Sequence, residues 1–179
     1  MSYLALYRKY RPQTFEEVVG QQYVTKILKN TIERHMTSHA YLFSGPRGTG
    51  KTTIAKLIAK LLNCENPIDD KPCEKCPSCI AFNEKNHPDI IEMDAASNNG
   101  VDEIREIRDK VTLMPSISKY KVYIIPDAHR MNEQAQNALL KTLEEPPAYA
   151  VIILLSDNES ALLPTIVSRC ITLQMKPVS

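Results

Sequence analysis

Short apolar segments recur along the chain, and longer segments with helical spacing separate them. The expected strands are residues 41–44, 89–93, 121–125, 150–155 and 171–174, and the expected helices are residues 22–36, 51–62, 102–111 and 132–143. This alternation favours a mostly parallel sheet covered by helices on both faces. Residues 122–125 and 151–155 are apolar throughout, as central parallel strands are. The pattern therefore predicts a three-layer α/β domain with a five-stranded sheet.

A phosphate-binding pattern follows the first expected strand. Residues 45–52 read Gly-Pro-Arg-Gly-Thr-Gly-Lys-Thr, which matches G-x-x-x-x-G-K-[ST] between a strand and a helix, a context that an ordinary glycine-rich turn lacks. Lys51 would reach the β- and γ-phosphates of a nucleoside triphosphate, and the Thr52 hydroxyl would hold Mg²⁺. The residues expected to bind the nucleotide here are Gly45, Pro46, Arg47, Gly48, Thr49, Gly50, Lys51, Thr52 and Thr53.

Composition narrows the class of protein. The chain has 179 residues, of which 43% are hydrophobic, and this suits one globular domain with a sizeable core. A net charge of +1 gives no global basic field, so any contact with DNA would come from a local patch. No apolar run approaches the ~20 residues of a membrane helix, and residues 1–10 lack the order of a signal peptide. We therefore expect a cytoplasmic protein with reduced cysteines and no membrane contact.

Four of the five cysteines form a C-x8-C-x2-C-x2-C pattern, made of Cys64, Cys73, Cys76 and Cys79. Four thiolates suit one tetrahedral Zn²⁺, and a closed shell of four sulfurs would make the site structural rather than catalytic. A redox pair in one C-x2-C is the competing interpretation. The spacing favours a zinc-binding insertion over residues 64–79. Cys170 stands apart and is expected to be a small buried hydrophobic residue.

Several longer segments, together with the phosphate loop and the cysteines, carry a family resemblance. They are residues 7–21, 38–45, 94–105, 137–147 and 168–170. With these segments the chain resembles the N-terminal AAA+ domain of the gamma/tau subunits of bacterial DNA polymerase III, the ATPases of the sliding-clamp loader. The resemblance implies a P-loop AAA+ fold over residues 1–179, with the family's lid and collar domains absent. It also implies ATP and Mg²⁺ as ligands.

The family assigns roles to further positions. Adenine would be wrapped by Tyr10, Arg11, Pro12, Val18 and Val19, although the apolar members of this set are nearly as well explained as core residues. Arg169 resembles the arginine finger, which acts on the nucleotide of a neighbouring subunit. Spacing alone would instead make Arg169 a surface residue paired with a carboxylate. The resemblance also implies partners: the other clamp-loader subunits in a ring, the sliding clamp and primer-template DNA bound without sequence specificity.

The chain departs from the family at its second nucleotide motif. The family usually has Asp-Glu after the apolar strand, and here Pro126 and Asp127 follow residue 125. Proline supplies neither charge nor donor, and an aspartate in the second position is one methylene shorter than glutamate. A one-residue slip would give Asp127 the metal role and leave Ala128 in place of the base. His129 as a substitute base carries little weight.

The strand expected at 150–155 also ends differently from the family, where a threonine hydroxyl senses the γ-phosphate. Ser156 or Asn158 is the candidate here. Residues 126–136 look more like the delta-prime subunit of the same loader, which has little or no ATPase activity. In the helix expected at 102–111, the basic side chains would either face DNA phosphates or belong to a solvated helix face.

Three functional hypotheses remain from the sequence. The first is an ATPase subunit of the DNA polymerase III clamp loader, with Lys51, Asp127 and Arg169 as catalytic residues. The second is a subunit that binds the nucleotide without hydrolysing it and serves the ring as a structural, delta-prime-like member. The third makes the zinc-binding insertion a protein-docking module and the nucleotide incidental.

Overall fold

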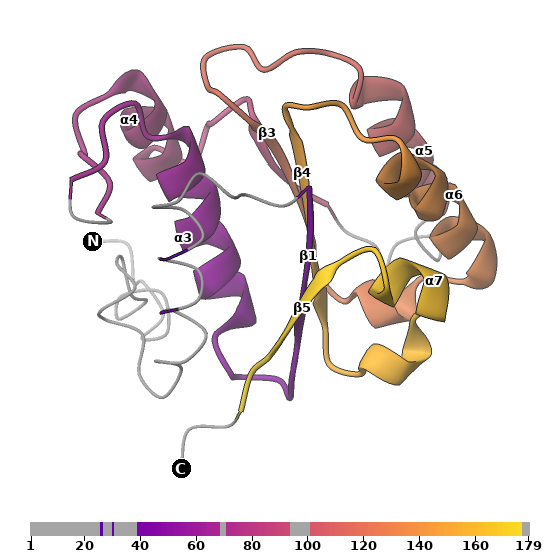
Figure 1. Ribbon diagram of the computed structural model, residues 1–179. Helices are drawn as coiled ribbons and strands as arrows, with labels where there is room; N and C mark the ends of the chain where they lie inside the picture. The colour runs from indigo at the N-terminus through magenta and orange to yellow at the C-terminus, as the bar shows by residue number, and fades with distance from the viewer. Residues whose placement is uncertain (1–25, 27–29, 31–38, 69–70, 94–100, 177–179) are drawn as a thin grey trace, which may run out of the picture.

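A parallel sheet forms the centre of the computed structural model, which describes residues 26, 30, 39–68, 71–93 and 101–176 (Figure 1). Within these residues the strand order is β2-β3-β4-β1-β5, and each neighbouring pair is parallel. The strands are β1 (Ala40–Ser44), β2 (Ile90–Glu92), β3 (Lys121–Ile125), β4 (Ala150–Ser156) and β5 (Ile171–Gln174). The predicted parallel α/β sheet is therefore confirmed.

Helices cover both faces of this sheet. They are α3 (Lys51–Asn63), α4 (Pro77–Asn83), α5 (Val101–Lys110), α6 (Glu133–Glu144) and α7 (Pro164–Val167), with short 3₁₀ turns η3 (Ala128–Arg130) and η4 (Glu159–Ala161). Figure 1 shows α3 and α4 on one side of the sheet and α5, α6 and α7 on the other. The helices predicted at 51–62, 102–111 and 132–143 each agree to within one residue. The helix predicted at 22–36 lies outside the described residues, apart from Lys26 and Asn30.

Alternate side chains of each central strand enter two separate cores. In β1, Tyr41 and Phe43 belong to the core under α3, where they join Ile58 of that helix. Leu42 points the other way and joins Leu139 of α6. Burial of such side chains stabilises the fold by about 1.5–3 kcal/mol each. The two cores therefore fix the carboxyl ends of β1, β3 and β4 relative to one another.

Local capping sets the helix ends. Asn132 precedes α6, and its side chain accepts a hydrogen bond from the Ala135 N–H at 2.8 Å. Helix α4, which the sequence analysis did not predict, begins in the same way. The Cys76 sulfur accepts from the Cys79 N–H, and Pro77 occupies the first turn, where its missing N–H is harmless. None of the described helices combines the length and the apolar character that crossing a membrane would require.

The loop between α5 and β3 is held against the sheet by Asp89. This side chain is fully buried, and its carboxylate accepts hydrogen bonds from three backbone N–H groups. The donors are Ser116 at 2.6 Å, Ile117 at 2.8 Å and Ser118 at 2.9 Å. Hydrogen bonds to an ionised acceptor are the stronger kind, and here they balance the burial of the charge.

Candidate functional site

The predicted phosphate loop connects β1 to α3. Its last residue, Gly50, caps α3 with φ at 89°, in the left-handed region that glycine adopts without strain. Inside the loop, the Thr49 hydroxyl donates to the Pro46 carbonyl at 2.8 Å. No side chain caps the N-terminus of α3, so its first N–H groups are available to an anion.

Gly45 is required by a close approach to the C-terminal end of β5. A Cβ at this position would lie 2.3 Å from the Met175 carbonyl oxygen and 3.1 Å from its carbonyl carbon. The Met175 N–H donates to the Ser44 carbonyl at 2.7 Å, so the two backbones are pinned together there. The first glycine of the pattern thus lets the loop turn away from a backbone that leaves no room for a side chain.

Lys51, the first residue of α3, is buried, with 9% of its surface exposed. Its ammonium group donates to the Gly45 carbonyl and, at 3.0 Å, to the Pro46 carbonyl. A third bond of 3.0 Å joins it to the carboxylate of Asp157. An ammonium group has three donors, so all of them are occupied.

A cavity of about 340 Å³ opens beside this lysine at the carboxyl ends of β3 and β4. Its lining residues are Arg47, Gly48, Gly50, Lys51, Thr52, Thr53, Pro126, Asp127, Leu155 and Asp157. Ligands of open α/β sheets bind at this edge. The structure thus brings together most of the loop residues predicted from the sequence with the two residues at which the chain departs from the family.

Asp127 and Pro126 follow β3 directly. Asp127 has a left-handed backbone, with φ at 52°, which turns the chain sharply into η3. One ligand atom each from Asp127, His129 and Asp157 lies within 4.8 Å of the others. The carboxylates of Asp127 and Asp157 offer the oxygen donors that Mg²⁺ prefers, and His129 offers a nitrogen, so the acidic pair fits the Mg²⁺ that the resemblance implies.

The sequence analysis did not predict Asp157; it named Ser156 or Asn158 as the candidate and left both open. Neither neighbour lines the cavity. The Ser156 hydroxyl donates to the Asn158 carbonyl at 2.9 Å, and the Asn158 side chain accepts from the Ser160 N–H at 3.1 Å as the cap of η4. Its position could have indicated a role at this edge of the sheet, because Asp157 is the first charged residue after β4. Its hydrogen bond with Lys51 lowers the pKa of its carboxyl group.

Arg169 lies in the short connection between α7 and β5 and is not part of the cavity lining. Its guanidinium is 45% exposed and lies 3.4 Å from the Glu144 carboxylate at the end of α6. The residues predicted to contact adenine, namely Tyr10, Arg11, Pro12, Val18 and Val19, lie outside the described residues.

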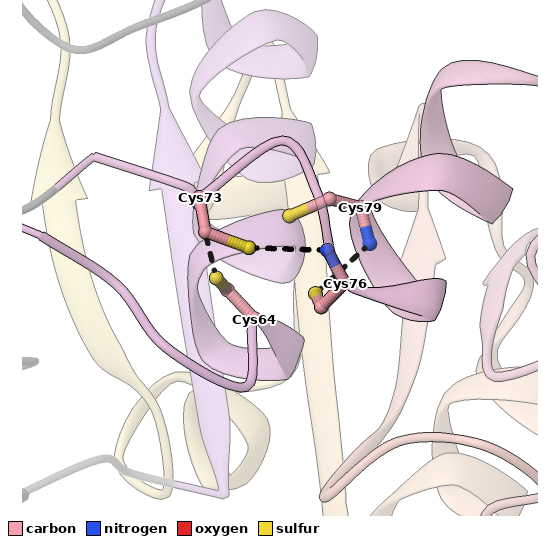
Figure 2. Close-up of side chains that lie close together, drawn as sticks. All are labelled: Cys64, Cys73, Cys76 and Cys79. Carbon is pink, nitrogen blue, oxygen red and sulfur yellow. Dashed lines mark hydrogen bonds between the residues drawn. The ribbon is translucent and has the colours of Figure 1, made fainter.

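The four patterned cysteines come together at the far end of α3. Figure 2 shows their sulfur atoms turned toward one another, and these atoms all lie within 4.8 Å. Cys64 is the C-cap of α3, and the three others approach from the start of α4 and the segment before it. Backbone N–H groups point at the sulfurs: Cys73 N–H to Cys64 Sγ at 3.2 Å, Cys76 N–H to Cys73 Sγ at 3.2 Å and Cys79 N–H to Cys76 Sγ at 3.4 Å.

Among the four cysteines, the surroundings of the partly exposed Cys73 favour the thiolate form. The Lys75 N–H, followed by the Cys76 N–H, lowers the pKa of Cys73 to about 6. Burial raises the pKa of Cys64 and of Cys79, so these thiols need a compensating positive charge to ionise. Four converging sulfurs with N–H donors behind them fit a structural zinc ion.

A buried charge ties α3 to the cysteine-bearing segment. Lys60 is 2% exposed, and its ammonium pairs with Glu74 and donates to Asn83 Oδ1 at 2.9 Å. The Asn83 amide in turn donates to the second oxygen of Glu74 at 2.6 Å, and the ammonium lies 5.3 Å from the centre of the Phe82 ring. The segment around α4 is therefore fixed to the helix that begins at the phosphate loop.

Comparison with known proteins supplies the family. A family model described as "DNA polymerase III, delta subunit" matches residues 20–179. The chain belongs to this family of DNA polymerase III subunits. Among its relatives, the DNA polymerase III subunit tau of Bacillus subtilis is 54% identical over all 179 residues, which make up 32% of that protein. The chain thus spans about a third of that relative.

Solved structures support the fold of this DNA polymerase III family member. A gamma subunit-related protein from Thermotoga maritima superposes with a TM-score of 0.54 at 31% identity, over 84% of this chain and 45% of that one. The RuvB Holliday junction branch migration motor of the same organism gives a TM-score of 0.58 at 20% identity, over 93% of this chain and 48% of that one. At that identity the likeness to RuvB shows the fold alone, a parallel α/β sheet with helices on both faces.

Proposed function

We propose that this chain is the ATP-binding AAA+ domain of a DNA polymerase III clamp-loader subunit. In this role it couples ATP binding and hydrolysis to loading of the sliding clamp on primed DNA. The observation that carries the proposal is the buried Lys51 at the mouth of a cavity on the carboxyl edge of the sheet. The relatives named as tau and gamma subunits support the assignment to the loader.

Phosphate binding would use the loop and the first turn of α3. The backbone N–H groups around Gly48 and Gly50 would surround the phosphates, and Lys51 would contact their β- and γ-oxygens. Thr52 and Thr53 line the cavity, and the Thr52 hydroxyl would ligate Mg²⁺. The cation would neutralise charge that develops on the γ-phosphate.

Hydrolysis would depend on Asp127. Its position directly after β3 and its place in the cavity lining suit a residue that orients the attacking water. Pro126, also in the lining, supplies no carboxylate for the metal, so the Thr52 hydroxyl and the phosphate oxygens would carry Mg²⁺. Arg169 lies outside this cavity and is exposed, which suits a group that reaches the nucleotide of a neighbouring subunit.

A second candidate function is favoured by the same proline. A subunit that binds ATP without hydrolysing it would keep the loop and Lys51, lose the metal-binding acid, and still offer Arg169 to its neighbour. This is the structural, delta-prime-like alternative. The two functions differ in turnover and agree in nucleotide binding.

The deciding experiment is phosphate release by a reconstituted loader with sliding clamp and primer-template DNA. Residues 1–179 would form the N-terminal domain of an otherwise complete subunit, compared with its Pro126→Asp, Asp127→Asn and Lys51→Ala variants. Turnover that is lost in Lys51→Ala and Asp127→Asn and changes little in Pro126→Asp would support the ATPase. Turnover found only in Pro126→Asp would establish the structural subunit and refute the ATPase.

The cysteine cluster would hold one zinc ion with Cys64, Cys73, Cys76 and Cys79 as ligands. The four-sulfur geometry leaves no open position, so the ion would stabilise the insertion rather than take part in hydrolysis. Its place next to α3 supports a structural role for the domain as a whole.

A further inference from the structure

Asp157 takes part in an interaction that the proposed phosphate chemistry does not require. It follows β4 at the edge of the cavity, and its Oδ1 lies 3.0 Å from the ammonium of Lys51. Lys51 is 9% exposed and Asp157 is 37% exposed, so a buried charge is paired with one that solvent can reach. The exposed partner of such a pair is the one that can move away.

The groups around Asp157 are those that would otherwise meet a phosphate. The hydrogen bond from Lys51, followed by the positive charges of Lys51, His129 and Arg47, lowers the pKa of the Asp157 carboxyl group. The Asp157 N–H also donates to His129 Nδ1 at 3.3 Å, which fixes its backbone to η3. The carboxylate thus occupies the positive field of the phosphate loop as a resident anion.

We propose that Asp157 is a displaceable counter-ion of Lys51, which the nucleotide must expel and which sets the affinity of the site. The inference rests on the proposed nucleotide binding. All three donors of the ammonium are occupied, two by neutral carbonyls of the loop itself and one by Asp157. A phosphate oxygen reaches Lys51 by replacing one of these acceptors, and Asp157 is the one on a separate, solvent-accessible segment.

The expelled carboxylate also distinguishes between nucleotides. Asp157 and Asp127 both line the cavity, and in the structure one carboxylate oxygen of each lies within 4.8 Å of the other. The γ-phosphate of ATP adds negative charge beside both, whereas ADP adds none at that position. Asp157 therefore weakens the binding of ATP more than that of ADP.

The test compares the wild-type chain with Asp157→Asn, which keeps the shape and removes the charge. The matched control is Asp109→Asn, the same change in an exposed residue of α5 that pairs with Arg108 and does not line the cavity. Calorimetric titration with ADP and with ATP, each with Mg²⁺, measures the affinities. We expect Asp157→Asn to bind ADP about threefold to fivefold more tightly and ATP more tightly still, with no change in the control.

A second readout separates counter-ion release from a general change in structure. Without nucleotide, Asp157→Asn should melt at a slightly lower temperature than the wild type, because Lys51 loses its charged partner. With ADP, its melting temperature should rise by more than that of the wild type. Asp157→Ala should repeat both effects.

Equal or weaker binding of ADP and ATP by Asp157→Asn would overturn the counter-ion proposal and leave the proposal of a nucleotide site unaffected. Absence of binding by the wild type and both variants would overturn the site itself, and the counter-ion with it.

Discussion

Two glycines of the phosphate loop should respond very differently to the same substitution. Gly45→Ala places a Cβ 2.3 Å from the Met175 carbonyl oxygen, an overlap with backbone rather than with a flexible side chain. Gly48→Ala meets nothing within 4 Å among the described residues, although Gly48 has φ at 85°. Both changes strain the backbone, and Gly45→Ala alone must also separate the loop from the end of β5.

The magnitudes follow from these geometries. A non-glycine residue in the left-handed region costs about 1–2 kcal/mol, which is the whole expected effect of Gly48→Ala. Gly45→Ala adds the displacement of a packed backbone, about 1–3 kcal/mol, and the loss of the 2.7 Å hydrogen bond from Met175 to Ser44, about 1 kcal/mol. We therefore expect losses of roughly 3–6 kcal/mol for Gly45→Ala, and a melting temperature that falls by about 6–24 °C.

Urea unfolding of the two variants and the wild type, followed by circular dichroism, measures both losses. The midpoint should fall with an unchanged slope, since the same surface is exposed on unfolding. A loss in Gly45→Ala no larger than that in Gly48→Ala would refute the reasoning. It would mean that the end of β5 moves aside without energetic consequence.

Four further outcomes are expected. The purified chain should carry one zinc ion, which Cys73→Ser reduces together with the free energy of unfolding and which Cys170→Ser leaves in place, as measured by atomic emission and thermal melting. Asp89→Asn should lower the free energy of unfolding by about 2–4 kcal/mol in urea titration, because one carboxylate oxygen with its charge is lost beneath three N–H donors. Tyr123→Phe should leave stability unchanged or raise it by up to about 1 kcal/mol in the same assay, because the buried hydroxyl has no partner among the described residues and burial raises the pKa of Tyr123 to about 12. The stability contributed by Asp157 should be present at neutral pH and lost as the pH falls below about 4, since its pKa is lowered on folding, and Asp157→Asn should flatten that part of the profile of unfolding free energy against pH.

The sheet could be predicted from the sequence because its central strands are apolar on both faces. Strands β1 and β4 are buried at every position, so their segments are continuous hydrophobic runs that no amphipathic helix would give. The helices that pack on them were predicted from the 3.6-residue spacing of their apolar residues. Gly50 and Asn132 cap the starts of α3 and α6, and Pro146 and Pro147 follow the end of α6.

The insertion was only half predictable. The spacing of the cysteines predicted that they would meet, and they do. Helix α4 was missed because it has only seven residues, of which Ser78 and Cys79 are buried, too few for a periodic pattern. Its start signal, Cys76 as a cap followed by Pro77, is visible in the sequence but uses a sulfur in place of the usual oxygen.

In the candidate site, the local sequence pattern was enough to predict the loop, but it could not predict that Asp157 pairs with Lys51. Lys51 and Asp157 are separated by 106 positions, and only the pairing of β1 with β4 brings them together. Because β1 and β4 are parallel and end at the same edge, the residue after β4 is placed beside the residue that starts α3. That placement follows from the strand order, which cannot be read from the spacing of residues along the chain.

Helix α3 connects the proposed phosphate site at its N-terminal end to the proposed zinc site at its C-terminal end. It has 13 residues, a length of about 20 Å, with Lys51 in its first turn and Cys64 as its C-cap. The Lys60 ion pair fastens α4 to the same helix. Any rotation of α3 that accompanies phosphate binding would therefore also move the cysteine-bearing segment. Thermodynamic linkage is reciprocal. A protein that binds that segment would therefore change the affinity for nucleotide by the same factor by which nucleotide changes the affinity for that protein.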